Sequence, residues 1–195
     1  LSSDGRYVIV FNGEIYNYKL LKEKLREFKF KSNSDTEVLL YMYIKYNTKC
    51  LNYLEGMFAF TIYDNKEKKI FSARDKFGIK PFYYQSDSER FTFASEIPAL
   101  LRLLDEKPGL NLQRTYDYLV FGRYDDQEST LHEGVKHLMP GHHLTICFSQ
   151  EKVVPEIERW WWPEIEERPN VSFEDATHEL REIFLQSVRF HLRSD

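Results

Sequence analysis

Two pairs of strand-like segments, each joined by a short polar turn, constrain the fold of this chain more than any other feature. Residues 57–63 and 69–74 are rich in aromatic and β-branched side chains, and a short polar segment separates them. Residues 81–85 and 90–95 form a second pair of the same kind. Turns this short join antiparallel strands, because a parallel connection needs about a dozen residues or more. The sequence therefore predicts an α+β fold with antiparallel sheets.

Helices are predicted before and after these hairpins. Residues 18–28 carry apolar side chains at helical spacing, and Ser34 begins a Ser-Asp-Thr-Glu segment that resembles a helix cap. The cap leads into residues 38–44, which are apolar nearly all round and are therefore predicted to form a buried helix. Further strands are predicted over 6–11 and 142–148, and further helices over 97–104 and 112–121.

The composition changes toward the C-terminal end. Residues 155–170 contain three prolines among glutamate and tryptophan residues, and we interpret them as a linker. Ser172 then caps a helix that is predicted to run to about Leu192. Because nothing in the given sequence follows to bury the apolar face of this helix, we interpret 171–195 as the start of another domain and 1–154 as the first domain.

Charge and composition argue against several classes of function. The formal net charge of −4 gives no reason to expect nucleic acid or a membrane surface as a partner. No apolar run approaches the roughly 18 residues of a membrane span. The two cysteines, Cys50 and Cys147, have no metal or redox spacing, which fits the reducing cytoplasm. His142 and His143 are adjacent on a predicted strand and point to opposite faces, so they cannot both bind one metal ion. We therefore expect a cytoplasmic protein without a metal site in these residues.

Asn12 and Gly13 are the first candidate site residues. A side-chain amide beside a glycine N–H, at the end of a buried strand, can stabilise developing negative charge as an oxyanion hole does. The same dipeptide is a common turn signal, and taken alone it favours a turn. Asp35 lies at a helix start, where a carboxylate ordinarily caps the helix but could instead hold the ammonium group of an amino acid. Arg74 and Asp75 are interpreted as a structural ion pair in a turn.

Six segments of the chain resemble, in order and spacing, the glutamine-hydrolysing asparagine synthetases. The segment at 11–18 is similar to the Asn-Gly-Glu-Ile-Tyr-Asn segment of that family, and the segment at 34–38 to its Ser-Asp-Thr-Glu segment. The other four lie at 55–60, 73–84, 93–97 and 138–142. The resemblance runs from about Arg6 to the end of the chain.

The resemblance implies the fold of the N-terminal-nucleophile hydrolases, which is a four-layer αββα sandwich with two antiparallel sheets. In this chain the sandwich would be incomplete. The helix at the C-terminal end would be the first helix of an α/β synthetase domain.

The resemblance also implies a site that hydrolyses glutamine. In similar enzymes an N-terminal cysteine thiolate attacks the side-chain amide of glutamine, and a γ-glutamyl thioester forms as ammonia leaves. Carried over to this sequence, the side-chain amide of Asn12 and the N–H of Gly13 would stabilise the oxyanion. Glu14 would contribute to the glutamine pocket, and Asp35 would pair with the α-ammonium group of the substrate.

In the family, ammonia passes through an interior tunnel to a second domain. There ATP, with Mg²⁺, activates aspartate, and the ammonia converts it to asparagine. The family pattern places the nucleophilic cysteine upstream of this sequence and the ATP-binding loop downstream. We therefore expect an inactive fragment with no cofactor of its own, in which Cys50 and Cys147 are structural. A homodimer is an expectation at the level of the family.

Two other functions remain open at this point. The same glutaminase fold could serve another acceptor, as in phosphoribosylamine- or glucosamine-forming enzymes, and the segment at 73–84 is partly shared with the first of these. The chain could also be a non-catalytic glutaminase-like module, as are relatives that lack the cysteine. Residues 154–195 resemble the continuation of asparagine synthetases, which favours glutamine-dependent asparagine synthesis over another acceptor.

Overall fold

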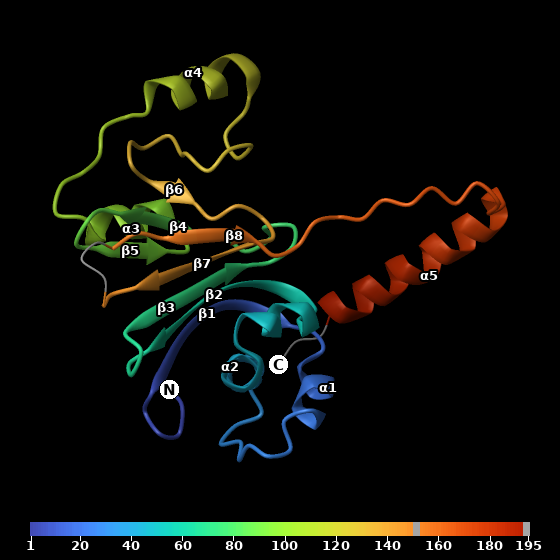
Figure 1. The fold of residues 1–195 in the computed structure, drawn as a ribbon. Coiled ribbons are helices and arrows are strands. Elements are labelled where there is room, and N and C mark those ends of the chain that lie inside the picture. The colour runs from blue at the N-terminus through green and yellow to red at the C-terminus, as the bar shows by residue number, and fades with distance from the viewer. Residues whose placement is uncertain (150–152, 193–195) are drawn as a thin grey trace. The chain divides into compact units, whose positions relative to one another are not determined.

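A five-stranded antiparallel sheet lies at the centre of the first of two units into which the chain divides, Leu1–Trp162 and Pro163–Asp195. The structure is a computed structural model that describes residues 1–149 and 153–192. The strands follow one another across the sheet in the order β1 (Tyr7–Ile15), β2 (Gly56–Asp64), β3 (Lys69–Arg74), β7 (His142–Cys147) and β8 (Glu156–Arg159), and each neighbouring pair is antiparallel (Figure 1).

A second, three-stranded sheet packs against one face of the first. Its strands lie in the order β5 (Phe91–Ala94), β4 (Tyr83–Ser86) and β6 (Lys136–His137). Apolar side chains from both sheets fill the space between them, among them Phe82, Leu144 and Ile146. On its outer face the second sheet carries helix α3 (Ile97–Leu103), which packs on β5. The two predicted hairpins, β2–β3 and β4–β5, are both confirmed.

Helices cover the other face of the five-stranded sheet. Helix α1 (Tyr18–Glu23) packs beside α2 (Asp35–Tyr46), which continues into the 3₁₀ helix η1 (Asn47–Tyr53). The middle of α2 is buried on all sides, and its side chains join those of β1, β2 and β3 in one apolar cluster. Helices, sheet, sheet and helix form four layers, so the predicted α+β sandwich with antiparallel sheets is confirmed (Figure 1).

Strand β1 shows how the sandwich faces are assigned. Tyr7, Ile9 and Phe11 pack against the cluster on the α2 side. Val8 and Val10 alternate with them, so they point toward the side of the second sheet, where 41% and 58% of their surfaces remain exposed. The strand thus carries a partly open apolar face directly before the candidate site residues.

Helix α4 (Leu112–Phe121) lies in the long connection between the two halves of the second sheet (Figure 1). Asn111 caps it by accepting a hydrogen bond from the N–H of Arg114, and Gly122 ends it in the left-handed conformation. The buried guanidinium group of Arg114 pairs with Asp117 and with Asp126, which fixes the segment that follows the helix.

The predicted linker 155–170 is wrong in its first part. Residues 156–159 form β8, which pairs with β7 so that Ile157 lies opposite Leu144. All four residues of β8 are exposed. The strand therefore forms because its main chain extends the ladder of β7, and not because it buries side chains.

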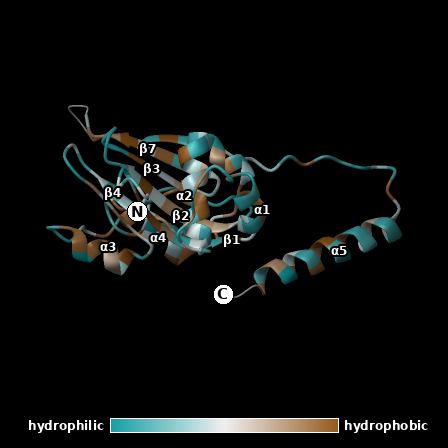
Figure 2. Ribbon diagram, turned by 90° about the horizontal axis from the view of Figure 1, so that it is seen from below, coloured by the Kyte–Doolittle hydropathy of each residue, from teal (hydrophilic) through white to brown (hydrophobic). Residues whose placement is uncertain are grey.

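The second unit contains helix α5 (Phe173–His191), which begins where the sequence predicted a cap, at Ser172. Its apolar residues fall along one side, as the alternating colours of Figure 2 show, and these include Leu180, Ile183 and Phe184. The assignment of 171–195 to a second domain stays a prediction, and its last three residues lie outside the described ones. Within the described part of the chain, no helix is long and apolar enough to cross a membrane.

Candidate functional site

Asn12 and Gly13 lie inside β1, not in a turn. Asn12 pairs with Ala59 and Gly13 with Phe58 on β2, and the ladder continues to Ile15. The turn that the dipeptide favours when taken alone is therefore wrong. The reason is non-local, because β2 supplies a pairing partner along the whole of this segment.

The main-chain N–H of Gly13 points away from β2. Tyr16 donates its N–H to Glu55 O at 2.7 Å, on the β2 side, whereas Ile15 donates its N–H to Asp35 at 3.0 Å, on the other side. The direction of the N–H groups alternates along an antiparallel strand, so Gly13 shares the direction of Ile15. Among the described strands, β1 is the last on this side of the sheet. The N–H of Gly13 therefore faces the open edge.

Close contact between the two main chains requires glycine at position 13. Its φ angle is +150°, and a Cβ atom there would lie only 2.1 Å from the carbonyl oxygen of Met57. Gly56 on β2 is in the matching situation, with a φ angle of +157° and Glu14 O at 2.1 Å from a Cβ atom. The two glycines let β1 and β2 approach each other at this point, which fixes the direction of the peptide groups around Gly13.

The side chain of Asn12 points to the opposite face from Phe11, toward the second sheet. It lines a cavity of about 300 Å³ between the sheets, together with Ala59, Phe82 and Phe93. Within the described part of the chain, no residue forms a hydrogen bond with the Asn12 amide. The amide is thus available to a ligand.

Asp35 does not cap its helix. Ser34 caps α2, because its hydroxyl group accepts a hydrogen bond from the N–H of Thr36. One carboxylate oxygen of Asp35 accepts the N–H of Ile15 at 3.0 Å, and the other accepts the hydroxyl group of Thr36 at 3.3 Å. The carboxylate is therefore directed at the open edge of β1, two residues beyond Gly13, which is about 7 Å along a strand.

Glu14 lies on the same face of β1 as Asn12, one alternation further along. Burial, together with the negative charges of Glu14 and Asp75, raises the pKa of Tyr16. The structure thus brings the four predicted site residues to one end of β1 and its neighbouring helix start: Asn12, Gly13, Glu14 and Asp35.

Arg74 and Asp75 form no ion pair with each other within the described residues, so that part of the prediction is wrong. The buried guanidinium group of Arg74 instead donates to the carbonyl oxygens of Gly78, Lys80 and Leu138. The two side chains follow each other on a strand and point to opposite faces, which prevents pairing. The predicted turn is confirmed, and main-chain groups hold it together.

The sequence gave no sign of how Asp75 would be used. Its carboxylate is 1% exposed and accepts hydrogen bonds from four main-chain N–H groups, those of Phe58, Phe77, Ile79 and Lys80. Phe58 is the residue opposite Gly13, so this carboxylate is attached to the site through β2. A charged turn was the only available signal, and it does not identify main-chain partners.

Neither cysteine lies at this site. Cys50 is fully buried in η1, and burial raises the pKa of its thiol to about 12. Cys147 lies three strands away from β1, in the same row of the sheet as Tyr7, five residues before Asn12. Strand spacing and rise place it roughly 20 Å from Asn12.

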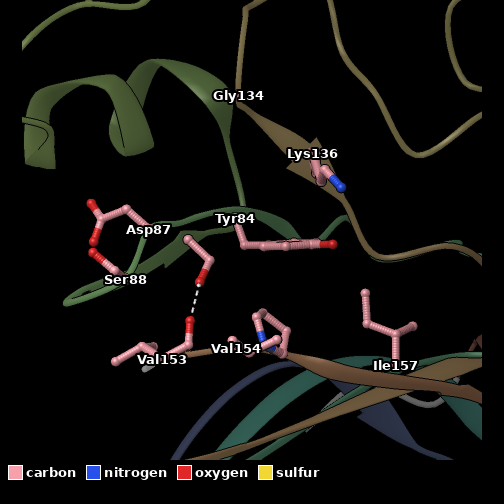
Figure 3. Close-up of a pocket in the computed structure, with 10 residues that line it drawn as sticks. Tyr84, Asp87, Ser88, Gly134, Lys136, Val153, Val154 and Ile157 are labelled. Atoms are coloured by element: carbon pink, nitrogen blue, oxygen red, sulfur yellow. Dashed lines mark hydrogen bonds between the residues drawn. The ribbon is translucent and has the colours of Figure 1, made fainter. Parts of the chain in front are cut away.

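A larger cavity lies elsewhere and contains none of the predicted site residues. It measures about 410 Å³ and lies between β4 and β6 on one side and residues 153–157 on the other (Figure 3). Tyr84 and Lys136 form one wall, and Ser86 donates a hydrogen bond to Val153 O across it. Within the described residues, no three His, Cys, Asp or Glu side chains come together as metal ligands.

Residues 1–161 match the family described as the glutamine amidotransferase domain. This chain belongs to that family. Among its relatives, asparagine synthetase [glutamine-hydrolyzing] 3 of Bacillus subtilis is 36% identical over 97% of this chain, and asparagine synthetase [glutamine-hydrolyzing] 1 of the same organism is 35% identical over 98%. The putative asparagine synthetase [glutamine-hydrolyzing] 2 of Methanocaldococcus jannaschii is 31% identical over 96% of this chain. The resemblance to this family that the sequence indicated is confirmed.

The amidotransferase chain spans only part of these relatives, namely 30% of each Bacillus subtilis protein and 36% of the Methanocaldococcus jannaschii protein. Among solved structures, glutamine phosphoribosylpyrophosphate amidotransferase from B. subtilis matches with a TM-score of 0.54 at 21% identity. That match covers 84% of this chain and 31% of the other. At this identity the match concerns the fold alone, and it confirms the predicted N-terminal-nucleophile hydrolase fold.

Proposed function

We propose that this amidotransferase domain binds glutamine, and that the full-length protein hydrolyses it to supply ammonia for the ATP-dependent conversion of aspartate to asparagine. The observation that carries the proposal is the arrangement at the open edge of β1. An amide without a partner among the described residues (Asn12), an outward main-chain N–H (Gly13) and a carboxylate (Asp35) lie within a few residues of one another. The relatives named as glutamine-hydrolysing asparagine synthetases support the reaction.

These groups match what amide hydrolysis needs. Attack on the glutamine amide moves negative charge onto its carbonyl oxygen, and the N–H groups of Asn12 and Gly13 stabilise that oxygen. The carboxylate of Asp35 binds the α-ammonium group, and Glu14 completes the pocket. The main-chain nitrogens of Gly13 and Ile15 are about 7 Å apart, a separation of the order that the two ends of glutamine require. Holding both ends orients the amide for attack.

The nucleophile in this proposal is a cysteine thiolate supplied from outside the given sequence. Cys50 is buried and Cys147 lies roughly 20 Å from Asn12, so neither can serve. The thiolate adds to the amide carbon, the C–N bond breaks as the nitrogen takes up a proton, and ammonia leaves a γ-glutamyl thioester. Water then hydrolyses the thioester to glutamate and regenerates the thiol.

The remaining parts of the proposal concern the rest of the protein. ATP and Mg²⁺ act in a synthetase part outside this domain, where aspartate is the acceptor. Assembly as a homodimer and a cytoplasmic location belong to the same proposal. The structure of residues 1–162 needs no cofactor for the contacts described above.

The substitution Asn12→Ala in the full-length protein tests the proposal. Loss of one oxyanion donor should lower glutamine-dependent turnover at least about a hundredfold. Synthesis of asparagine from aspartate, ATP and free ammonium should be unchanged, because ammonium bypasses this domain. Asn65→Ala, in the exposed turn between β2 and β3, is the matched control and should change neither activity.

Two outcomes would contradict the proposal. Equal losses with glutamine and with ammonium would remove the role of Asn12. A wild-type protein that releases no glutamate from glutamine would remove the function itself. Glutamate release without asparagine formation would show that the ammonia goes to another acceptor.

A further inference from the structure

We infer that Trp160 is a positioning residue for the oxyanion donor Gly13. The indole ring packs on Phe58 and holds the end of β3, and these two contacts fix the main chain against which Gly13 rests. The inference rests on the proposed function, because it concerns a donor to the substrate oxyanion. Its test is therefore arranged so that the two can fail separately.

The first step is the contact between Gly13 and Phe58. The two residues lie directly opposite each other on β1 and β2. A Cβ atom on Gly13 would lie 2.7 Å from the Cα atom of Phe58, so no space separates the two main chains. A displacement of Phe58 therefore displaces Gly13, and with it the direction of the Gly13 N–H.

The second step is the attachment of Phe58 to Asp75. The N–H of Asp75 donates to Phe58 O at 2.8 Å, and the N–H of Phe58 donates to the carboxylate of Asp75 at 3.2 Å. The side chain of Asp75 thus replaces a main-chain acceptor where the β2–β3 ladder ends. The same carboxylate accepts the N–H of Lys80 at 2.9 Å, so the turn after β3 and the strand beneath Gly13 share one anchor.

The third step is the position of Trp160 across both residues. Its ring stacks on Phe58, with centroids 6.2 Å apart and planes inclined by 19°. Its indole N–H donates to Arg74 O at 3.2 Å, directly before Asp75. Its main-chain N–H donates to Gly141 O at 2.9 Å, and Gly141 in turn donates to Asp75 O at 2.9 Å. Trp160 therefore reaches Phe58 directly, and Asp75 by two routes.

Trp160 is also suited to transmit strain from the chain that follows it. It is the first residue after β8 and is only partly buried. The next residue, Trp161, packs edge-on against Phe77 in the turn that Asp75 organises. The segment that leaves the first unit is thus attached to the strand pair that carries Gly13.

The test uses the full-length protein and three variants. Trp160→Leu removes the stacking ring and the indole N–H, whereas Trp160→Phe keeps a ring. Trp162→Leu is the matched control, since Trp162 is 62% exposed and packs on Arg159 at 3.3 Å from its ring centroid. Active sites are counted with a glutamine analogue that alkylates the nucleophile, so each rate is expressed per competent site.

We expect Trp160→Leu to lower kcat for glutamine hydrolysis about tenfold with KM within about twofold of wild type, because a misplaced donor acts on the transition state. Trp160→Phe should lose about threefold in the same way. Trp162→Leu should match wild type. The aldehyde analogue of glutamine forms a tetrahedral adduct with an oxyanion on the enzyme thiol, so its affinity should fall by the same factor as kcat/KM. The affinity for glutamate, which forms no such adduct, should not change.

Each outcome decides one question. Wild-type rates per site in both Trp160 variants would overturn the inference and leave the proposed function standing. Equal losses of affinity for the aldehyde and for glutamate would reduce Trp160 to a structural residue, which also overturns the inference. If Trp160→Leu does not fold, Trp160→Phe decides by the same comparison. A wild-type protein that neither hydrolyses glutamine nor binds the aldehyde would overturn the proposed function.

Discussion

The carboxylate of Asp35 accepts a hydrogen bond from the main-chain nitrogen of Ile15 at 3.0 Å, and this bond joins the start of α2 to the open edge of β1. Ser34 caps the helix, so the charge of Asp35 is not used for capping. The helix N-terminus stabilises the negative charge. An acid, an outward N–H at Gly13 and the Asn12 amide are therefore held close together before any substrate arrives.

Substitution of Asp35 by Asn should weaken glutamine binding more than it slows the reaction. The amide keeps an acceptor for the Ile15 N–H but loses the charge that pairs with the substrate ammonium group. A hydrogen bond to a charged group contributes about 1.5–3 kcal/mol, so KM for glutamine in the full-length protein should rise about 10- to 100-fold. The value of kcat should change less than about threefold, since the contact is made in ground state and transition state alike.

Glu37→Gln is the control for charge in the same helical turn. The carboxylate of Glu37 accepts hydrogen bonds from Lys31 N and Ser32 N and so points away from β1. Its KM for glutamine should stay within about threefold of wild type. Steady-state kinetics measures both variants, and an unchanged KM in Asp35→Asn would contradict the assigned role.

Substitution of Gly13 by Ala should destabilise the domain strongly. The Cβ atom would lie 2.1 Å from Met57 O, at a φ angle of +150° that side chains rarely adopt. Strain of about 1–3 kcal/mol adds to this overlap, so we expect the free energy of unfolding to fall by at least about 3 kcal/mol. Gly5→Ala is the control, because Gly5 has a φ angle of +73° but nothing within 4 Å of a Cβ atom. It should cost only about 1 kcal/mol. Urea unfolding followed by circular dichroism compares the two, and equal losses would contradict this account of the close strand contact.

Local patterns were sufficient for several elements of the fold. The strand over 69–74 and the helix over 112–121 have the predicted bounds. A hairpin turn fixes the first, and Asn111 and Gly122 cap the second at its two ends. These signals lie within a few residues of the element they define, so the sequence carries them directly.

Pairing between distant strands could not be predicted in this way. Asn12 and Gly13 continue β1 because β2 pairs with them, and a turn signal contains no information about β2. Strand β8 was interpreted as linker because its exposed residues show no alternating apolar pattern. The resemblance named Asp35, but only the folded chain directs its carboxylate at Ile15. Residues of the site that act through main-chain contacts, such as Asp75, leave no pattern at all.

The two cysteines should differ in reactivity. Burial raises the pKa of the Cys50 thiol to about 12, whereas hydrogen bonds with Ser149 lower the pKa of Cys147. Iodoacetamide at pH 8 should therefore label the native chain at Cys147 and reach Cys50 only after unfolding, because the thiolate is the reactive form. Peptide mass mapping after a timed reaction reads out the two sites. Equal labelling of Cys50 in the folded chain would show that the region around η1 opens readily.

The ion pair of Arg6 with Asp64 should make stability depend on pH in the acid range. The hydrogen-bonded guanidinium group of Arg6, at 2.6 Å, lowers the pKa of Asp64 from 3.8 to about 2. A folded-state pKa below the unfolded value adds stability that is fully present above pH 3.8 and is lost as the pH falls toward 2. A shift of this size corresponds to about 2 kcal/mol, and the carboxylate is 7% exposed, so little of it is screened.

Asp64→Asn isolates this contribution from the other carboxylates. The difference in free energy of unfolding between wild type and variant should be about 2 kcal/mol at pH 6 and should shrink toward zero near pH 2. Asp105→Asn breaks the exposed pair with Arg90 and should change stability by less than about 1 kcal/mol throughout. Urea titrations at a series of pH values supply both curves. A difference between wild type and Asp64→Asn that stays constant from pH 6 to pH 2 would mean that the hydrogen bonds to the turn, and not the charge, hold this end of β1 to β2.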